Sequence, residues 1–138
     1  MKAFLSFGMK KFISEFEINC SPKMLYQYIT EPSNLAQWFA DDVNFDNDKN
    51  LKLTIDGEEL RAKIISTKLN ECFKIEYLDE EGSQCEDPEY TKFTIERNDF
   101  TQSTYLIIEE KSEMYDTDLE HQELWQELVD ALKDVIGA

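Results

Sequence analysis

His121 is the only histidine in this 138-residue chain, and histidine is the side chain best suited to moving protons near neutral pH. One interpretation makes it a general base near the mouth of a cavity. No motif places a serine or cysteine nucleophile beside it, and a His-based metal site would need a second histidine. The other interpretation, a polar residue in the first turn of an amphipathic helix, is the one that the sequence favours. We therefore expect no catalytic residue, no metal and no cofactor.

Carboxylates are abundant, because Asp and Glu together number 30. Adjacent pairs such as Glu109 and Glu110 then arise by chance, and without apolar surroundings we expect them to be ordinary surface charge. The acidic segment at residues 79–89 could hold Ca²⁺, but its spacing does not match that of an EF-hand. A solvated loop is the favoured interpretation of this segment.

Arg61 and Arg97 are the only arginines, and each falls in a predicted strand. Either guanidinium could anchor a ligand carboxylate inside the sheet. The alternative, favoured by the many acidic residues, is a cross-strand ion pair with one of them.

The cysteines and the N-terminus bear on the compartment. Cys20, Cys72 and Cys85 are odd in number, widely spaced and free of any CxxC motif. Reduced thiols are then the default, so we expect a cytoplasmic protein. The apolar stretch at residues 3–7 is too short for a secretory signal or a membrane span, so we expect no membrane insertion.

The composition is that of a folded, strongly acidic protein. A formal net charge of −16 and a pI of about 4.3 argue against binding nucleic acid or an anionic membrane through phosphates. Hydrophobic residues at 41% and aromatic residues at 12% supply a packed core and oppose disorder. The length fits one domain, which we expect at residues 10–138 behind a short extension at residues 1–9. Met9 could be the true start.

The first part of the chain predicts one strand and two short helices. Residues 10–19 alternate between apolar and polar side chains, the period of a half-buried strand. Ser21 is a good N-cap and Pro22 fits the first helical position, so a helix should begin there and stop near Thr30. A second short helix should carry its apolar residues on one face: Leu35, Trp38 and Phe39.

Six short strands and a long helix follow. The strands are expected near residues 42–47, 51–57, 59–67, 72–79, 91–97 and 104–110, joined by short polar turns in an antiparallel meander. Thr117 and Glu120 form a capping box, and Gly137 fits a C-terminal cap, which predicts a helix of about 19 residues. Its apolar stripe comprises Leu119, Trp125, Leu128, Val129, Leu132, Val135 and Ile136. The order predicts an α+β sandwich of two layers, in which this helix covers the sheet.

Three segments resemble the START-like superfamily, also called SRPBCC. EFEINCSPKMLYQYIT at residues 15–30 is similar to its opening strand, Ser-Pro start and aromatic-bearing helix. EPSNLAQWFADDV at residues 31–43 is similar to its Trp-Phe stretch, and LWQELVDALKDVIG at residues 124–137 to its C-terminal helix. The nearest branch is the one related to the activator of the ninety-kilodalton heat-shock chaperone ATPase, although Leu124 stands where that branch usually has glycine.

The resemblance implies the helix-grip fold, a curved antiparallel β-sheet of six to seven strands wrapped on a long C-terminal α-helix, with two short helices after the first strand. A hydrophobic cavity often lies between the sheet and the long helix. Eight residues become candidates for ligand binding there: Tyr28, Trp38, Phe39, Arg61, Tyr77, Arg97, Tyr105 and Trp125. The alternative for the aromatic residues is that they simply fill the core.

Three functions remain open at this stage, because members of the family bind lipids, hormones or polyketides, act on them chemically, or act on protein partners. The leading hypothesis is a non-catalytic domain that binds a small hydrophobic ligand, a lipid or an aromatic molecule, in the cavity. The second is a protein-interaction or chaperone-accessory module whose acidic faces steer a basic partner. A cyclase- or hydrolase-like enzyme is the weaker third. The chain could be a monomer or a homodimer, since the sheet has free edges.

Overall fold

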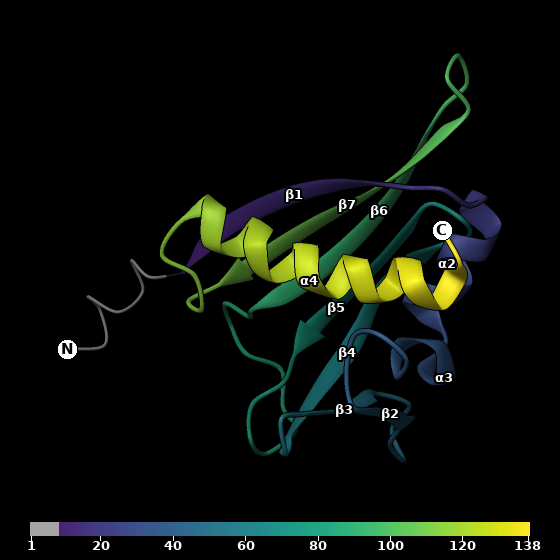
Figure 1. The fold of residues 1–138 in the computed structure, drawn as a ribbon. Helices are drawn as coiled ribbons and strands as arrows, with labels where there is room; N and C mark the ends of the chain where they lie inside the picture. Colours follow the sequence, from purple (N-terminus) through teal and green to yellow (C-terminus); the bar gives the residue numbers. More distant parts are fainter. Residues whose placement is uncertain (1–8) are drawn as a thin grey trace.

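A computed structural model describes residues 9–138, which form one sheet crossed by one long helix (Figure 1). Of the predicted extension at residues 1–9, the first eight lie outside the described residues. The strands are β1 (Lys10–Ile18), β2 (Asp42–Phe45), β3 (Leu51–Ile55), β4 (Glu58–Lys68), β5 (Cys72–Tyr77), β6 (Tyr90–Asn98) and β7 (Ser103–Ser112). The helices are α2 (Pro22–Thr30), α3 (Pro32–Leu35) and α4 (Asp118–Ile136).

The seven strands form an antiparallel sheet in the order β1-β7-β6-β5-β4-β3-β2. Helix α4 lies across one face of this sheet, and the end of the β6–β7 hairpin projects beyond it (Figure 1). A sheet with one apolar face needs such a cover, because its inner side chains would otherwise remain in water. The predicted helix-grip α+β fold is confirmed.

Strands β1 and β7 lie side by side, with Lys10 opposite Ser112 and Ile18 opposite Thr104. Alternate residues of each strand point to the helix side and are buried, as the period of two predicts. In β1 these are Phe12, Ser14, Phe16 and Ile18; in β7 they are Thr104, Leu106, Ile108, Glu110 and Ser112. The inner face therefore contains a buried carboxylate.

The two short helices after β1 form as predicted, with one difference. The Ser21 side chain caps α2 by accepting from the Met24 N–H at 3.1 Å. Helix α3 ends at Leu35, so Trp38 and Phe39 follow it in a turn whose N–H groups bond to the Leu35 carbonyl, at 3.3 and 2.8 Å. The Trp38 indole N–H donates to the backbone carbonyl of Tyr28 at 2.9 Å and so joins this turn to α2.

Helix α4 begins at the predicted cap, where Thr117 Oγ1 accepts from the Glu120 N–H at 3.2 Å. The return bond differs from a complete capping box, because the Glu120 carboxylate accepts from Asp116 rather than from Thr117. Gly137 ends the helix with a positive φ of 85°, which glycine adopts without strain. Leu119, predicted in the apolar stripe, is 63% exposed, and His121 occupies a buried position instead.

Four aromatic side chains form the centre of the core between sheet and helix: Trp38, Phe39, Phe93 and Trp125. Their ring centroids lie between 5.7 and 6.3 Å apart, mostly edge to face, a favourable arrangement for aromatic pairs. The cluster brings together the turn after α3, strand β6 and the middle of α4.

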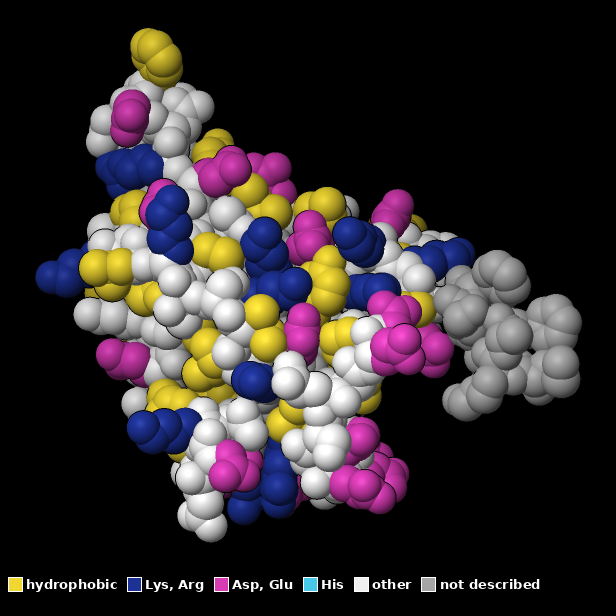
Figure 2. Space-filling model, turned by 180° about the vertical axis from the view of Figure 1, so that it is seen from behind, with side chains coloured by type: hydrophobic (Ala, Val, Ile, Leu, Met, Phe, Trp, Pro, Cys, Tyr) yellow, Lys and Arg dark blue, Asp and Glu magenta, His cyan; other side chains and the backbone are white. Residues whose placement is uncertain are grey.

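Charge is distributed unevenly over the surface. The outer face of the sheet, seen in Figure 2, mixes acidic and basic side chains. Strand alternation places several of the basic residues there, among them Lys52, Arg61, Lys63, Lys74 and Lys92. The exposed side of α4 is acidic and carries Asp118, Glu120, Glu123, Glu127, Asp130 and Asp134. Within residues 9–138, no helix combines the length and the apolar character needed to cross a membrane.

Candidate functional site

Glu110 lies on the inner face of β7, where only 8% of the residue is exposed. The expectation that it is surface charge is wrong, because strand alternation places it in line with the buried Leu106 and Ile108. Its neighbour Glu109 points to the outer face and accepts from the Tyr90 hydroxyl at 2.5 Å. The two adjacent carboxylates therefore lie on opposite faces of the sheet.

The buried carboxylate is surrounded by hydrogen-bond donors from three elements. Oε1 accepts from the Trp125 indole at 2.6 Å and the Tyr115 hydroxyl at 2.8 Å, and it lies 3.1 Å from His121 Nε2. Oε2 accepts from the Thr91 hydroxyl at 2.8 Å. A charge taken out of water is tolerated when its hydrogen bonds are replaced in this way.

These contacts also determine the ionisation of Glu110. Burial acts to raise the pKa of the carboxyl, but the donors His121, Trp125, Tyr115 and Thr91 outweigh it and bring the pKa below its ordinary 4.5. Burial and the nearby negative charge raise the pKa of the Tyr115 hydroxyl, which therefore stays protonated as a donor. At neutral pH the site therefore contains an ionised carboxylate.

His121 extends the network toward β1. It is fully buried, and its Nδ1 lies 2.7 Å from the Ser14 hydroxyl. His121 does lie in the first turn of α4, as the favoured interpretation has it, but it faces the core rather than the surface. The structure also places a serine beside it, which no motif had indicated, because the two residues are 107 positions apart.

Ser14, His121 and Glu110 include the residue types of a hydrolase triad, but their geometry differs from one. In a triad the serine contacts Nε2 and the acid contacts Nδ1, whereas here the two contacts are exchanged. Ser14 is 5% exposed and His121 is 0% exposed, and neither is among the described residues that line the two cavities below. The arrangement holds Glu110 in place and gives a substrate no access to the serine.

A cavity of about 1000 Å³ lies between α4 and the sheet. Its wall combines the turn after α3, the β3–β4 hairpin, the ends of β5 and β7, and the inner side of α4. Trp38, Phe39, Trp125 and Leu128 contribute apolar surface, while Glu110 and the two tyrosines of its network, Tyr77 and Tyr115, contribute polar groups. The volume is in the range of small-molecule sites, and a mostly apolar wall with a few polar groups is typical of them.

Four of the eight candidate ligand-binding residues come together in this wall: Trp38, Phe39, Tyr77 and Trp125. The aromatic cluster therefore fills part of the core and also lines a cavity. Tyr28 is half-buried on α2 and packs against the core, outside the set of residues lining the cavity. Arg61 points to the outer face of the sheet, where its guanidinium lies 3.8 Å from Glu59. Glu59 and Arg61 both belong to β4, so this ion pair lies along one strand and differs from the cross-strand pair of the alternative interpretation.

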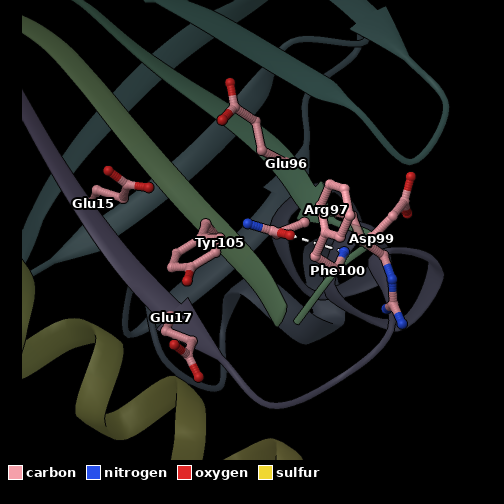
Figure 3. A pocket seen from close by; sticks show the side chains of 8 residues that line it. Glu15, Glu17, Glu96, Arg97, Asp99, Phe100 and Tyr105 are labelled. Carbon is pink, nitrogen blue, oxygen red and sulfur yellow. Dashed lines mark hydrogen bonds between the residues drawn. The ribbon is translucent and has the colours of Figure 1, made fainter. Parts of the chain in front are cut away.

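Arg97 and Tyr105 line a different hollow, of about 770 Å³, alongside the end of the β6–β7 hairpin. Figure 3 shows Tyr105 between Glu15 and Glu17 of β1, with the Arg97 guanidinium pointing away from its ring. Arg97 donates to Gln102 at 2.7 Å within its own hairpin. Neither arginine is among the residues that line the cavity under α4.

The residues that sequence reasoning missed are Glu110, Tyr115, Thr91 and Ser14. A signal for two of them was present, because Ser14 and Glu110 are in phase with buried apolar residues of their strands. His121 is likewise one turn before Trp125 on the apolar side of α4. A polar residue in phase with a buried stripe predicts a buried polar contact.

Comparison with known families identifies the fold. The model of the START-like superfamily domain matches residues 7–138, which is nearly the whole chain. The chain belongs to the START-like superfamily. Among curated proteins, none matches the sequence.

Solved structures with the same fold come from distant relatives. A protein from Mesorhizobium loti has a TM-score of 0.72 at 14% identity, covering 93% of this chain and 97% of that one. The Aha1 dimer from Colwellia psychrerythraea has a TM-score of 0.68 at 18% identity, covering 91% of this chain and 95% of that one. A Bacteroides fragilis protein has a TM-score of 0.59 at 23% identity, covering 93% of this chain and 91% of that one. At these identities the likeness shows the START-like fold and leaves the ligand open.

Proposed function

We propose that this START-like domain binds a small, mostly hydrophobic molecule in the cavity between the sheet and α4, without converting it chemically. The observation that carries the proposal is the cavity itself, about 1000 Å³ in volume with Trp38, Phe39 and Trp125 in its wall. Burying an apolar ligand there gains about 25 cal/mol for each Å² removed from water. The three free cysteines favour a reducing compartment, so the cytoplasm is the proposed location.

The absence of catalysis is part of the proposal. The polar groups that face the cavity are a carboxylate with four donors and two tyrosines bound into the same network. The serine and histidine that could form a nucleophile pair lie behind this wall. The wall is therefore suited to orienting a ligand.

Intrinsic fluorescence tests ligand binding directly, because both tryptophans of the chain, Trp38 and Trp125, line the cavity. Titration with a library of lipids and small aromatic molecules should give saturable changes for some members. Ala131 lines the cavity from α4, so Ala131→Phe should place a phenyl ring in it and weaken binding. Gln126→Phe adds the same side chain to the exposed side of the same helix and serves as the control. A library without any saturating ligand, or an Ala131→Phe protein that binds normally, would contradict the proposal.

A second candidate, a protein-interaction module, is favoured by one observation. Phe100 at the tip of the β6–β7 hairpin is 100% exposed, and Asn98 Oδ1 holds its turn by accepting from the N–H groups of Phe100 and Thr101. The hollow beside it is lined by four acidic residues, which would steer a basic partner: Glu15, Glu17, Glu96 and Asp99. The similar Aha1 protein is a dimer, so self-association is the first interaction to test. Analytical sedimentation of the native chain and of Phe100→Ser compares their oligomeric states.

A further inference from the structure

The directions of the hydrogen bonds around Glu110 follow from the number of protons available. Thr91 has a single hydroxyl proton, and it donates this proton to Glu110 Oε2. The Tyr77 hydroxyl lies 2.9 Å from the Thr91 oxygen, so Tyr77 must be the donor in that contact. The Tyr115 hydroxyl likewise donates to Glu110 Oε1. Both phenolic protons are thus used inside the network.

The phenol oxygens and the carboxylate then meet the cavity only as hydrogen-bond acceptors, and Tyr77, Tyr115 and Glu110 all line it. Glu110 retains capacity, because a carboxylate offers about four lone-pair positions and Oε2 receives one donor against three at Oε1. The Trp125 indole N–H is also used on Oε1, so this aromatic presents only its rings to a ligand.

The charge around the cavity has the same sign as this carboxylate. Five acidic residues line it: Asp41, Asp56, Glu58, Glu89 and Glu110. Lys111 is the single basic residue among those that line it, and its side chain pairs with Asp87. Negative charge in a partly enclosed apolar site attracts cations and repels carboxylates and phosphates.

We propose that the ligand of this cavity is an apolar molecule that carries a protonated amine, which donates to Glu110 and Tyr77. The inference rests on the proposed ligand-binding function and names the chemical class. The apolar part lies against Trp38, Phe39 and Trp125, and aromatic faces are also favourable surfaces for an alkylammonium group. A fatty acid of the same size would bring an anion and further acceptors to Glu110, Tyr77 and Tyr115, which already face the cavity as acceptors.

Three probes with one apolar chain and different head groups separate these possibilities: n-octylamine, n-octanol and sodium octanoate. Calorimetric titration of the native protein at pH 7, below the micelle-forming concentrations, gives a Kd for each. We expect octylamine to bind at least about tenfold more tightly than octanoate, with octanol between them, since a hydrogen bond to a charged group has about that effect.

Variants show whether the head group of the probe contacts Glu110 and Tyr77 in the cavity wall. Tyr77→Phe removes the acceptor that faces the cavity and should reduce the preference for the amine about threefold or more, whereas Tyr105→Phe, in the other hollow, should leave it unchanged. Glu110→Gln should reduce the preference further, with Glu109→Gln as its control on the opposite face. If Glu110→Gln does not fold, the amine preference of Tyr77→Phe alone tests whether the head group binds at this wall. A net charge of −16 attracts cations to the whole surface. Ala131→Phe, which obstructs the cavity, must therefore also weaken amine binding if the amine binds there.

The outcomes distinguish this inference from the function on which it rests. If octanol or octanoate binds as tightly as octylamine, the proposal of an amine ligand is wrong. The proposed function, binding of a hydrophobic molecule, is then still supported. An amine preference that survives both Tyr77→Phe and Ala131→Phe also overturns it, because the amine then binds elsewhere. Failure of all three probes to bind counts against both proposals.

Discussion

Trp125 Nε1 lies 2.6 Å from Glu110 Oε1, so a hydrogen bond joins the middle of α4 to the inner face of β7. His121, one turn earlier on the helix, contacts the same oxygen at 3.1 Å. Two side chains of one helix thus converge on one carboxylate of the sheet. This connection fixes the position of α4 over the sheet and, with it, the width of the cavity beside Trp125.

Removing the charge of Glu110 should destabilise the fold. In Glu110→Gln the amide NH₂ must face at least one donor, so at least one buried polar contact is lost. We expect the free energy of unfolding to fall by about 3 kcal/mol, measured by urea denaturation. Glu109→Gln, which loses only a charged acceptor for Tyr90 on the outer face, should cost about 1 kcal/mol. Equal losses in the two variants would show that Glu110 has no special role.

Glu110 also makes a specific contribution to acid stability. Because its pKa is lower in the folded protein than the ordinary 4.5, the carboxylate stabilises the fold fully above that value. The contribution should be lost as the pH falls from about 4.5 through the lower folded pKa. The groups that face it are His121, Tyr115, Thr91 and Trp125. The many other acidic residues titrate in both proteins, so the difference between native and Glu110→Gln stability isolates this carboxyl, and it should shrink toward pH 3. A difference that stays constant from pH 7 to pH 3 would contradict the assignment.

Much of the fold could be predicted because it follows from local patterns. The alternation of β1 and the cap and stripe of α4 each indicate an element from neighbouring residues. The two-layer arrangement then follows from the need to cover one apolar face. The elements appear where these patterns place them, apart from the early end of α3 before Trp38.

The site was harder to predict, because its contacts join residues far apart in the chain. Ser14 and His121 meet only when β1 lies under α4, and no spacing in the sequence encodes that contact. Burial of Glu110 could have been inferred from its phase with Ile108, but the abundance of acidic residues outweighed that signal. The position of Tyr105 on the outer face follows from the same phase, since it alternates with Leu106.

Ser14 should matter for stability and have no effect on ligand binding. Ser14→Ala removes the hydroxyl that contacts His121 Nδ1, leaving a buried nitrogen without its partner, so we expect a loss of about 1–2 kcal/mol. Ligand affinity, measured by tryptophan fluorescence for the best ligand of the library, should stay within a factor of two. A large loss of affinity without loss of stability would instead indicate that Ser14 touches the ligand.

Phe100 should contribute nothing to the fold, because its side chain is 100% exposed at the hairpin tip. Phe100→Ser should leave the free energy of unfolding within about 0.5 kcal/mol of the native value in thermal denaturation. A selective loss of self-association or of a salt-sensitive partner would support the second candidate function. A substantial drop in stability would show that the hairpin packs in solution against another part of the molecule.

The most direct test is a crystal structure of the native protein grown with n-octylamine. The account predicts the octyl chain in the cavity against Trp125, with the amine nitrogen within hydrogen-bond distance of Glu110 Oε2 or the Tyr77 hydroxyl. An amine bound only outside the cavity, or a cavity that side chains close completely, would contradict it.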